Sequence, residues 1–199
     1  MGYQLNEKIR DLRPYDPITG TYPIRLDANE SFLPIPNRSA LKMMEAAAFT
    51  AYNRYPDPLA SELCKSFAEY YHVNPAYVTA GNGSDELISV VCSAFLMKGD
   101  TMMTVSPDFS MYHFYASIAE AKSIVYQKDP DLTINVDKMI DIANTHDAKV
   151  ILFSNPCNPT SLGLLKEEIR RLITSVRALV VLDEAYMDFW DQSLLDEVG

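Results

Sequence analysis

The feature that most constrains the fold is the alternation of short apolar runs with helix-like segments from residue 76 onward. Short apolar runs bounded by Gly, Pro, Asn or Asp are typical of buried strands. We expect strands at Ala76–Thr79, Thr101–Val105, Ser123–Tyr126, Lys149–Phe153 and Ala178–Leu182. We expect helices at Asp85–Met97, Phe109–Ala119, Val136–Ala143 and Lys166–Ser175. Strands joined through helices need crossover connections, so the pattern predicts an α/β fold with a mostly parallel sheet and helices on both faces.

The residues before this alternation have a different character. From about Leu5 to Pro36 the chain is rich in Pro, Asn and Asp and lacks periodicity, which predicts a short helix followed by an extended arm. Two further helices are expected, from Arg38 to about Tyr52 and from Leu59 to about Tyr71. The segment Tyr55-Pro56-Asp57-Pro58 separates them, because proline is not tolerated in a helix interior and restricts the residue before it.

The charge balance limits the possible partners. The chain has 17 Lys and Arg against 27 Asp and Glu, a formal net charge of −10. We therefore expect no binding to nucleic acid or to an anionic membrane, since both require a basic surface. A small anionic ligand is still possible, because local donors at a helix N-terminus can hold a phosphate.

The sequence also predicts a reduced, cytoplasmic setting. The three cysteines have no disulfide-like or metal-like spacing, and we expect no metal site. The polar N-terminus does not resemble a signal peptide, and no run approaches the ~20 apolar residues of a membrane span.

Four polar loops follow expected strands. Ligands of open α/β sheets bind outside the carboxyl ends of the strands, so the four loops together describe a candidate site. Their sequences are GNGSDE (81–86), SPDFSMY (106–112), SNPCNPTS (154–161) and DEAY (183–186).

The first of these loops, GNGSDE, joins a strand to a helix. Its glycines allow a tight turn, and the orphan N–H groups and dipole of the following helix would attract a phosphate. It is neither the Rossmann nor the Walker motif, because the third glycine and the Gly-Lys pair are missing. A plain turn with Ser84 as helix N-cap is the alternative, and taken alone this alternative is favoured.

Asp183 ends an apolar strand, where a carboxylate is costly unless it meets a cationic partner. A protonated pyridine nitrogen would be such a partner. A metal-binding or Walker-B-like acid and a simple strand-end turn are the alternatives.

The other loops carry an amide and aromatic rings. The two Asn-Pro steps of NPCNPT predict a rigid loop that could hold one amide over a ligand, or a merely proline-rich connection. Phe109 could stack on a flat cofactor or pack in the core, and Tyr55 could donate a hydrogen bond or cover apolar surface.

Taken in order, the segments LDANES (26–31), RYPDP (54–58), GNGSDE, PDFSMY, NPCNPT and DEAY carry a resemblance. The chain resembles fold-type I pyridoxal-phosphate (PLP) aminotransferases and, within them, the histidinol-phosphate aminotransferase group. LDANES near the start favours this group over aspartate or aromatic transaminases. The resemblance implies an N-terminal arm and small-domain segment at residues 1–36 and an incomplete PLP-binding large domain at residues 37–199.

The resemblance assigns residues to the cofactor phosphate and ring. Ser84, Asp85 and Glu86 would lie at the phosphate, partly through backbone N–H groups. Phe109 would stack on the pyridine ring. Tyr55 would reach the phosphate of the neighbouring subunit, which implies a homodimer with shared sites.

It also assigns residues to the ring substituents and to the substrate. Asp183 would pair with the ring nitrogen and keep it protonated. Asn158 and Tyr186 would hydrogen-bond the phenolic oxygen. Tyr15 and Asn29 match positions near the substrate.

The chain departs from the family pattern in several places. Ser161 replaces the usual glycine after Asn-Pro-Thr, and Phe32 replaces a proline after LDANES. No lysine matches the family's Schiff-base lysine, which would follow DEAY, and the last lysine is Lys166. We therefore expect the 199 residues alone to be inactive.

The resemblance implies PLP-dependent transamination of histidinol phosphate with 2-oxoglutarate in histidine biosynthesis. A PLP-dependent decarboxylase or lyase on the same fold, such as the threonine-phosphate decarboxylase relatives, is the nearest alternative. A non-catalytic dimerisation or regulatory fragment is another. A nucleotide-binding protein is more distant, because neither phosphate-loop motif is complete.

Overall fold

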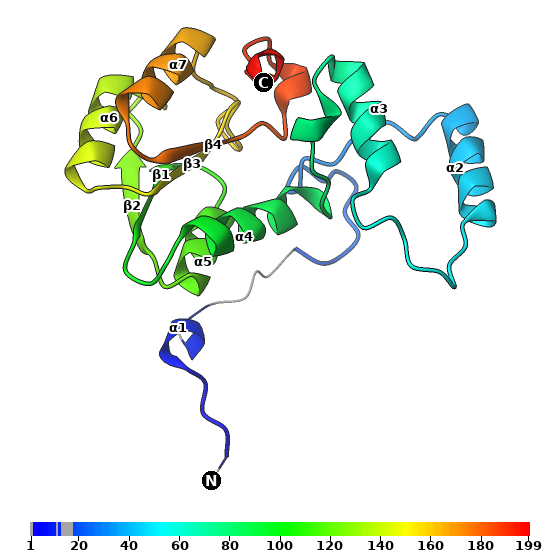
Figure 1. The fold of residues 1–199 in the computed structure, drawn as a ribbon, viewed down its shortest axis with the longest axis horizontal. Helices are drawn as coiled ribbons and strands as arrows, with labels where there is room; N and C mark the ends of the chain where they lie inside the picture. Colours follow the sequence, from blue (N-terminus) through cyan, green and yellow to red (C-terminus); the bar gives the residue numbers. More distant parts are fainter. Residues whose placement is uncertain (1, 11, 13–17) are drawn as a thin grey trace. The chain divides into compact units, whose positions relative to one another are not determined.

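The computed structural model describes residues 2–10, 12 and 18–199 (Figure 1). Contacts divide the chain into two compact units. One combines the N-terminal segment that ends at Leu12 with Ser61–Gly199, and the other lies within Arg13–Ala60. The division into an arm and a large domain after residue 36 stays a prediction.

In chain order the elements are α1 (Glu7–Arg10), α2 (Asn37–Phe49), α3 (Ser61–Tyr71), η1 (Pro75–Tyr77), α4 (Gly83–Phe95), β1 (Thr101–Ser106), α5 (Met111–Ile118), β2 (Lys122–Gln127), α6 (Val136–Thr145), β3 (Val150–Ser154), α7 (Lys166–Ser175), β4 (Leu179–Asp183), η2 (Met187–Phe189) and η3 (Leu195–Glu197). Of these, α2 belongs to the second unit and the rest belong to the first.

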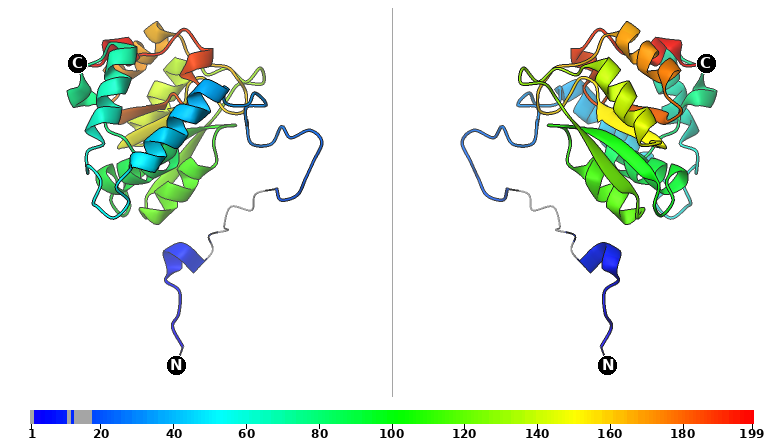
Figure 2. Two further views of the ribbon diagram at one scale, coloured as in Figure 1. Left: turned by 90° about the vertical axis from the view of Figure 1, so that its right-hand side faces the viewer. Right: turned by 90° about the vertical axis from the view of Figure 1, so that its left-hand side faces the viewer.

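The four strands form one parallel sheet in the order β2-β1-β3-β4. Its two faces carry separate cores, because successive side chains of a strand point to opposite sides. Met103 of β1 and Phe153 of β3 pack with α6 and α7. Met102 of β1 and Leu152 of β3 pack with α4 and α5. Helices therefore cover both faces (Figures 1 and 2), and the expected α/β class is confirmed.

The positions of the helices follow from the strand order. The connection from β1 to β2 moves in one direction across the sheet, and those from β2 to β3 and from β3 to β4 move in the other. Parallel crossovers are nearly always right-handed, so opposite directions require opposite faces. Accordingly α5 lies on one face, and α6 and α7 lie on the other (Figure 1).

The prediction of a strand at Ala76–Thr79 is wrong. Residues Pro75–Tyr77 form the 3₁₀ helix η1 instead. Asn74 caps it by accepting a hydrogen bond from Ala76 N (2.9 Å), and Pro75 fits the first helical position. Val78 is extended but donates its N–H to Pro75 O (3.1 Å), so local hydrogen bonds take the donors that a ladder would use.

Candidate functional site

The candidate site begins where β1 and β3 lie side by side. The chain leaves Ser106 toward β2 and leaves Ser154 toward β4, on opposite sides of the sheet. Loops that diverge in this way open a crevice at the carboxyl ends of the strands, the usual ligand position of such sheets. Three of the four polar loops, SPDFSMY, SNPCNPTS and DEAY, begin at strands of this edge.

Asp183 ends β4 directly beside Ser154 of β3, since the two are register partners. It follows Val181 by two residues and shares the face of the sheet on which Val181 packs with the α4 and α5 core. Glu184, one residue later, turns away and binds Ser193 Oγ (2.6 Å) and Leu194 N (3.1 Å). Of the two acids in DEAY, only Asp183 therefore belongs to the crevice.

Both carboxylate oxygens of Asp183 accept hydrogen bonds. The phenol of Tyr112 donates to Oδ2 (2.9 Å), and the backbone N–H of Ala185 donates to Oδ1 (3.1 Å). Tyr112 lies on α5 and is fully buried. Burial, and then the negative charge of Asp183, raise the pKa of the Tyr112 phenol far above its ordinary value. The phenol therefore keeps its proton and acts as a fixed donor.

Phe109 lies in the loop between β1 and α5 and is half-buried. Its ring meets that of Tyr112 edge to face, with centroids 5.6 Å apart. Tyr112 was not among the site residues expected from the sequence. Its spacing of three residues from Phe109 at the start of a helix is the signal that could have found it, because such residues share a face.

The two Asn-Pro steps have different roles. Asn155 is buried, and its side chain accepts from Leu164 N (2.7 Å) and donates to Leu164 O (3.3 Å), which closes the loop. Asn158 is half-buried, and its backbone N–H donates to Ser154 Oγ (3.1 Å). Both peptide bonds, and that between Ser106 and Pro107, are cis. Because Asn155 closes the loop, Asn158 is the candidate of the two for ligand binding.

The GNGSDE loop leads into α4, which begins at Gly83 with Asn82 as N-cap residue. Ser84 is thus inside the first turn, and the alternative of Ser84 as N-cap is wrong. The Glu86 carboxylate reaches back to this N-cap residue and accepts from Asn82 N and from Asn82 Nδ2 (3.1 Å). This contact orders the turn in front of the helix.

The helix α5, whose Tyr112 binds Asp183, also contacts the start of α4. Burial raises the pKa of Tyr115 on α5, as do the charge of Asp85 and a hydrogen bond to it. Tyr112 and Tyr115 lie three residues apart on α5, so one helix face reaches both Asp183 and Asp85. This arrangement brings the expected phosphate-binding turn and the expected nitrogen partner to one side of the sheet.

The remaining residues of the predicted set lie elsewhere. Tyr186 is half-buried in the turn after Asp183, and its carbonyl accepts from Phe189 N (3.0 Å). Asn29 and Tyr55 belong to the second unit, where Tyr55 is fully exposed and Asn29 has a φ of 51°. Tyr15 lies outside the described residues. The roles expected of these four residues stay predictions.

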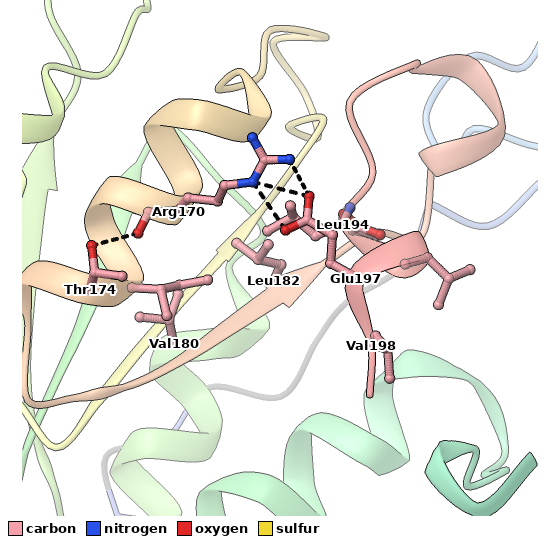
Figure 3. A pocket seen from close by; sticks show the side chains of 10 residues that line it. Arg170, Thr174, Val180, Leu182, Leu194, Glu197 and Val198 are labelled. Carbon is pink, nitrogen blue, oxygen red and sulfur yellow. Dashed lines mark hydrogen bonds and ion pairs between the residues drawn. The ribbon is translucent and has the colours of Figure 1, made fainter. Parts of the chain in front are cut away.

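A hollow of about 460 Å³ lies beside β4, on the opposite face of the sheet from Asp183 (Figure 3). Val180 and Leu182 line it from β4, and Leu194 and Val198 from the end of the chain. The ion pair of Arg170 with Glu197 borders it. Its mostly apolar lining carries no part of the candidate site.

Metal clusters and membrane spans are both absent from the described part of the chain. Residues 2–10, 12 and 18–199 contain no group of three or more His, Cys, Asp or Glu side chains arranged to hold a metal ion. Within the same ranges, no helix is long and apolar enough to cross a membrane.

Comparison with known proteins identifies the class. Residues 22–198 match the family model of class I and II aminotransferases, and the chain belongs to this family. It is 40% identical over 190 residues to a histidinol-phosphate aminotransferase of Clostridium novyi (strain NT), covering 96% of this chain and 53% of the relative. A histidinol-phosphate aminotransferase of Clostridium kluyveri is 38% identical over 192 residues, covering 96% and 55%. The chain thus spans about half the length of the curated relatives it matches.

The fold agrees with this classification. The crystal structure of histidinol-phosphate aminotransferase from Sinorhizobium meliloti, in complex with pyridoxal-5'-phosphate, matches with a TM-score of 0.75 at 21% identity. The match covers 81% of this chain and 44% of that chain. An aspartate aminotransferase from Thermotoga maritima matches with a TM-score of 0.71, also at 21% identity. It covers 86% of this chain and 50% of that chain.

Proposed function

We propose that this chain forms the PLP-binding part of an aminotransferase that acts on histidinol phosphate with 2-oxoglutarate, in histidine biosynthesis. The family match supports transamination, and the names of the most similar curated relatives support this substrate. The name of the Sinorhizobium meliloti structure supports the cofactor. The observation that carries the proposal is the position of Asp183, held at the end of β4 in the crevice.

The fixed carboxylate of Asp183 suits a cationic ring nitrogen. Two neutral donors, the Tyr112 phenol and the Ala185 N–H, hold its oxygens without neutralising the charge. Each oxygen has a further lone pair for a ligand N–H. PLP, when bound, supplies an electron sink for the substrate's Cα, and this requires a protonated ring nitrogen. The role of Asp183 is then to keep that proton in place.

The opposite end of the cofactor would lie at the start of α4. The N–H groups of Ser84 and Asp85 belong to the first turn, where the helix dipole favours a phosphate. Glu86 already places a carboxylate beside Asn82, and two anions repel each other. We therefore assign Glu86 to ordering the loop and the backbone of the first turn to binding the phosphate.

Three side chains would fix the ring between these ends. Phe109 would stack on its face, where the edge contact with Tyr112 holds the phenyl ring. Asn158 and Tyr186 would hydrogen-bond the phenolic oxygen. These contacts bind and orient the ring, and none of them transfers a proton at Cα.

We also propose that the protein is a homodimer with shared sites. Tyr55 would reach the phosphate bound by the partner, and Tyr15 and Asn29 would lie near the substrate. Large apolar side chains of the second unit are exposed in the single chain, among them Phe32 (91%) and Phe49 (84%). Exposed apolar side chains of this size are typical of association surfaces.

A titration with PLP tests the proposal. The wild-type chain should bind one PLP and give induced circular dichroism in the cofactor absorption band. D183A should weaken binding on the order of tenfold, as expected for loss of one charge-assisted hydrogen bond. D141A removes an exposed carboxylate on α6 and should bind as the wild type does.

The same samples test the activity that is assigned to this chain. With histidinol phosphate and 2-oxoglutarate we expect PLP binding without turnover, because no lysine follows DEAY in these 199 residues. Equal binding by D183A and the wild type would contradict the proposed site. Turnover by the homogeneous chain would contradict the assignment of cofactor binding alone.

A further inference from the structure

A single carboxylate, that of Asp108, joins the ends of β1 and β3. Asp108 follows β1 and is partly buried. Its Oδ1 accepts from Phe109 N (2.7 Å) and from Ser154 Oγ, and its Oδ2 accepts from Ser154 N (3.1 Å). The pair Asp108 and Ser154, called the clasp below, therefore spans the point where the two loops diverge.

The clasp continues into the NPCNPT loop. The Ser154 hydroxyl donates to Asp108 and accepts from the backbone N–H of Asn158 (3.1 Å). One hydrogen-bonded path thus runs from Phe109 N through Asp108 and Ser154 Oγ to Asn158 N. Its two ends belong to the residues that would stack on the cofactor ring and bind its phenolic oxygen.

A partly buried carboxylate is expensive unless its hydrogen bonds compensate for lost water. Here burial raises the pKa of Asp108, while the hydrogen bonds of Ser154 and Phe109 and the charge of Lys128 lower it. The hydrogen bonds of Asp108 go to Phe109 N, to Ser154 N and to the Ser154 hydroxyl. Two of its donors are backbone N–H groups, so the carboxylate fixes main chain rather than mobile side chains.

We propose that Asp108 is a positioning residue, and that the clasp sets the separation of Phe109 and Asn158 on the two sides of the crevice. This inference rests on the proposed function for the identity of the ligand. The coupling between the two loops belongs to the fold itself. A one-loop role, in which Asp108 only orders the backbone of Phe109, would leave Asn158 unaffected.

The loop coupling is tested without any cofactor, by amide hydrogen exchange resolved by NMR. In D108N an NH₂ group replaces one carboxylate oxygen. If it takes the place of Oδ2, it faces the Ser154 N–H, and two donors cannot form a hydrogen bond, so this contact of the clasp is lost. We expect exchange on the order of tenfold faster at both Phe109 and Asn158, the loss of about 1.4 kcal/mol of protection. D141N, a matched change on the exposed surface of α6, should alter neither amide. Faster exchange at Phe109 alone would overturn the proposal.

The positioning role is tested with pyridoxamine 5'-phosphate, which needs no lysine to bind. D108N should raise its Kd about tenfold and change the induced circular dichroism at saturation, because the ring sits differently. S154A removes only the hydroxyl that links Asp108 to Asn158, and it should show the same change in the spectrum. It therefore provides a second test if D108N folds poorly. A lower unfolding free energy with unchanged Kd and spectrum would overturn the positioning role. If the wild-type chain does not bind pyridoxamine 5'-phosphate, the proposed function is contradicted. The hydrogen-exchange experiment uses no cofactor, so it still tests whether the clasp couples the two loops.

Discussion

At the scale of single residues, the contact between Tyr112 and Asp183 links the buried core to the candidate site. Asp183 could be selected from the sequence because an acid ends an apolar strand. Its donor lies 71 residues away in the chain and could not be selected in the same way. Asp108 and Ser154 were missed for a related reason, since each looks like an ordinary loop residue until β1 and β3 are paired.

Removing the phenol of Tyr112 tests this contact. Y112F should lower the free energy of unfolding by about 1–3 kcal/mol, because the Asp183 oxygen loses its buried donor. Urea denaturation measures the change. Y70F, on a residue that is 74% exposed, should stay within about 0.5 kcal/mol of the wild type. A Y112F protein as stable as Y70F would show that the hydrogen bond has no net effect.

The pH dependence of stability tests the electrostatics of Asp108. Burial is the largest influence on its pKa, which is raised above the ordinary value of 3.8. The folded protein thus binds this proton more tightly than the unfolded chain does. The stability from Asp108 is fully present below pH 3.8 and is lost as the pH rises through the raised pKa.

Asn cannot titrate, so D108N isolates this group. The unfolding free energy of the wild type minus that of D108N should fall as the pH rises from 3.8 through the raised pKa of Asp108, and should be constant at higher pH. Urea titrations of both proteins in a pH series measure it. A difference that increases with pH would mean that Lys128 and the hydrogen bonds outweigh burial.

At the scale of elements, the sequence predicted most of the fold from periodicity. The α7 bounds agree with the expected Lys166–Ser175, since an amphipathic pattern lies between two polar turns. The helix at Val136 and four of the five strands also appear, with shifted ends. The strand at 76–79 failed because the Asn74-Pro75 cap is a local signal that apolar composition hides. The start of α4 was placed two residues late, because the helix begins at Gly83 after Asn82 rather than after Ser84.

The loop after β3 gives a test at this scale. A Cβ at Gly163 would lie 2.7 Å from Asn155 Oδ1 and 3.2 Å from the Trp190 ring. G163A should therefore destabilise the protein by about 1–3 kcal/mol through crowding. Thermal and urea unfolding measure the change, and G2A, with no atom within 4 Å of its added Cβ, serves as the control. If G163A unfolds like G2A, Asn155 does not depend on the absence of a side chain there.

At the scale of the whole molecule, the topology explains why the site could be located from the sequence. The order β2-β1-β3-β4 makes a switch point between β1 and β3. Polar loops with little likeness to one another then converge because they follow neighbouring parallel strands. The described residues of the second unit follow no strand, so the sequence pattern left two alternatives open for Tyr55 and did not select Asn29. Family resemblance assigned a role to each, and these roles stay predictions.

The central claim is that Asp183 faces a protonated ring nitrogen, and one measurement addresses it directly. It is the ¹⁵N chemical shift of the pyridine nitrogen of labelled pyridoxamine 5'-phosphate, bound to the wild type and to D183N. The pH is set above the value at which the free ligand loses its ring proton. We predict a protonated nitrogen on the wild type and a deprotonated one on D183N. A ring nitrogen deprotonated on both proteins, or protonated on both, would contradict the role given to Asp183.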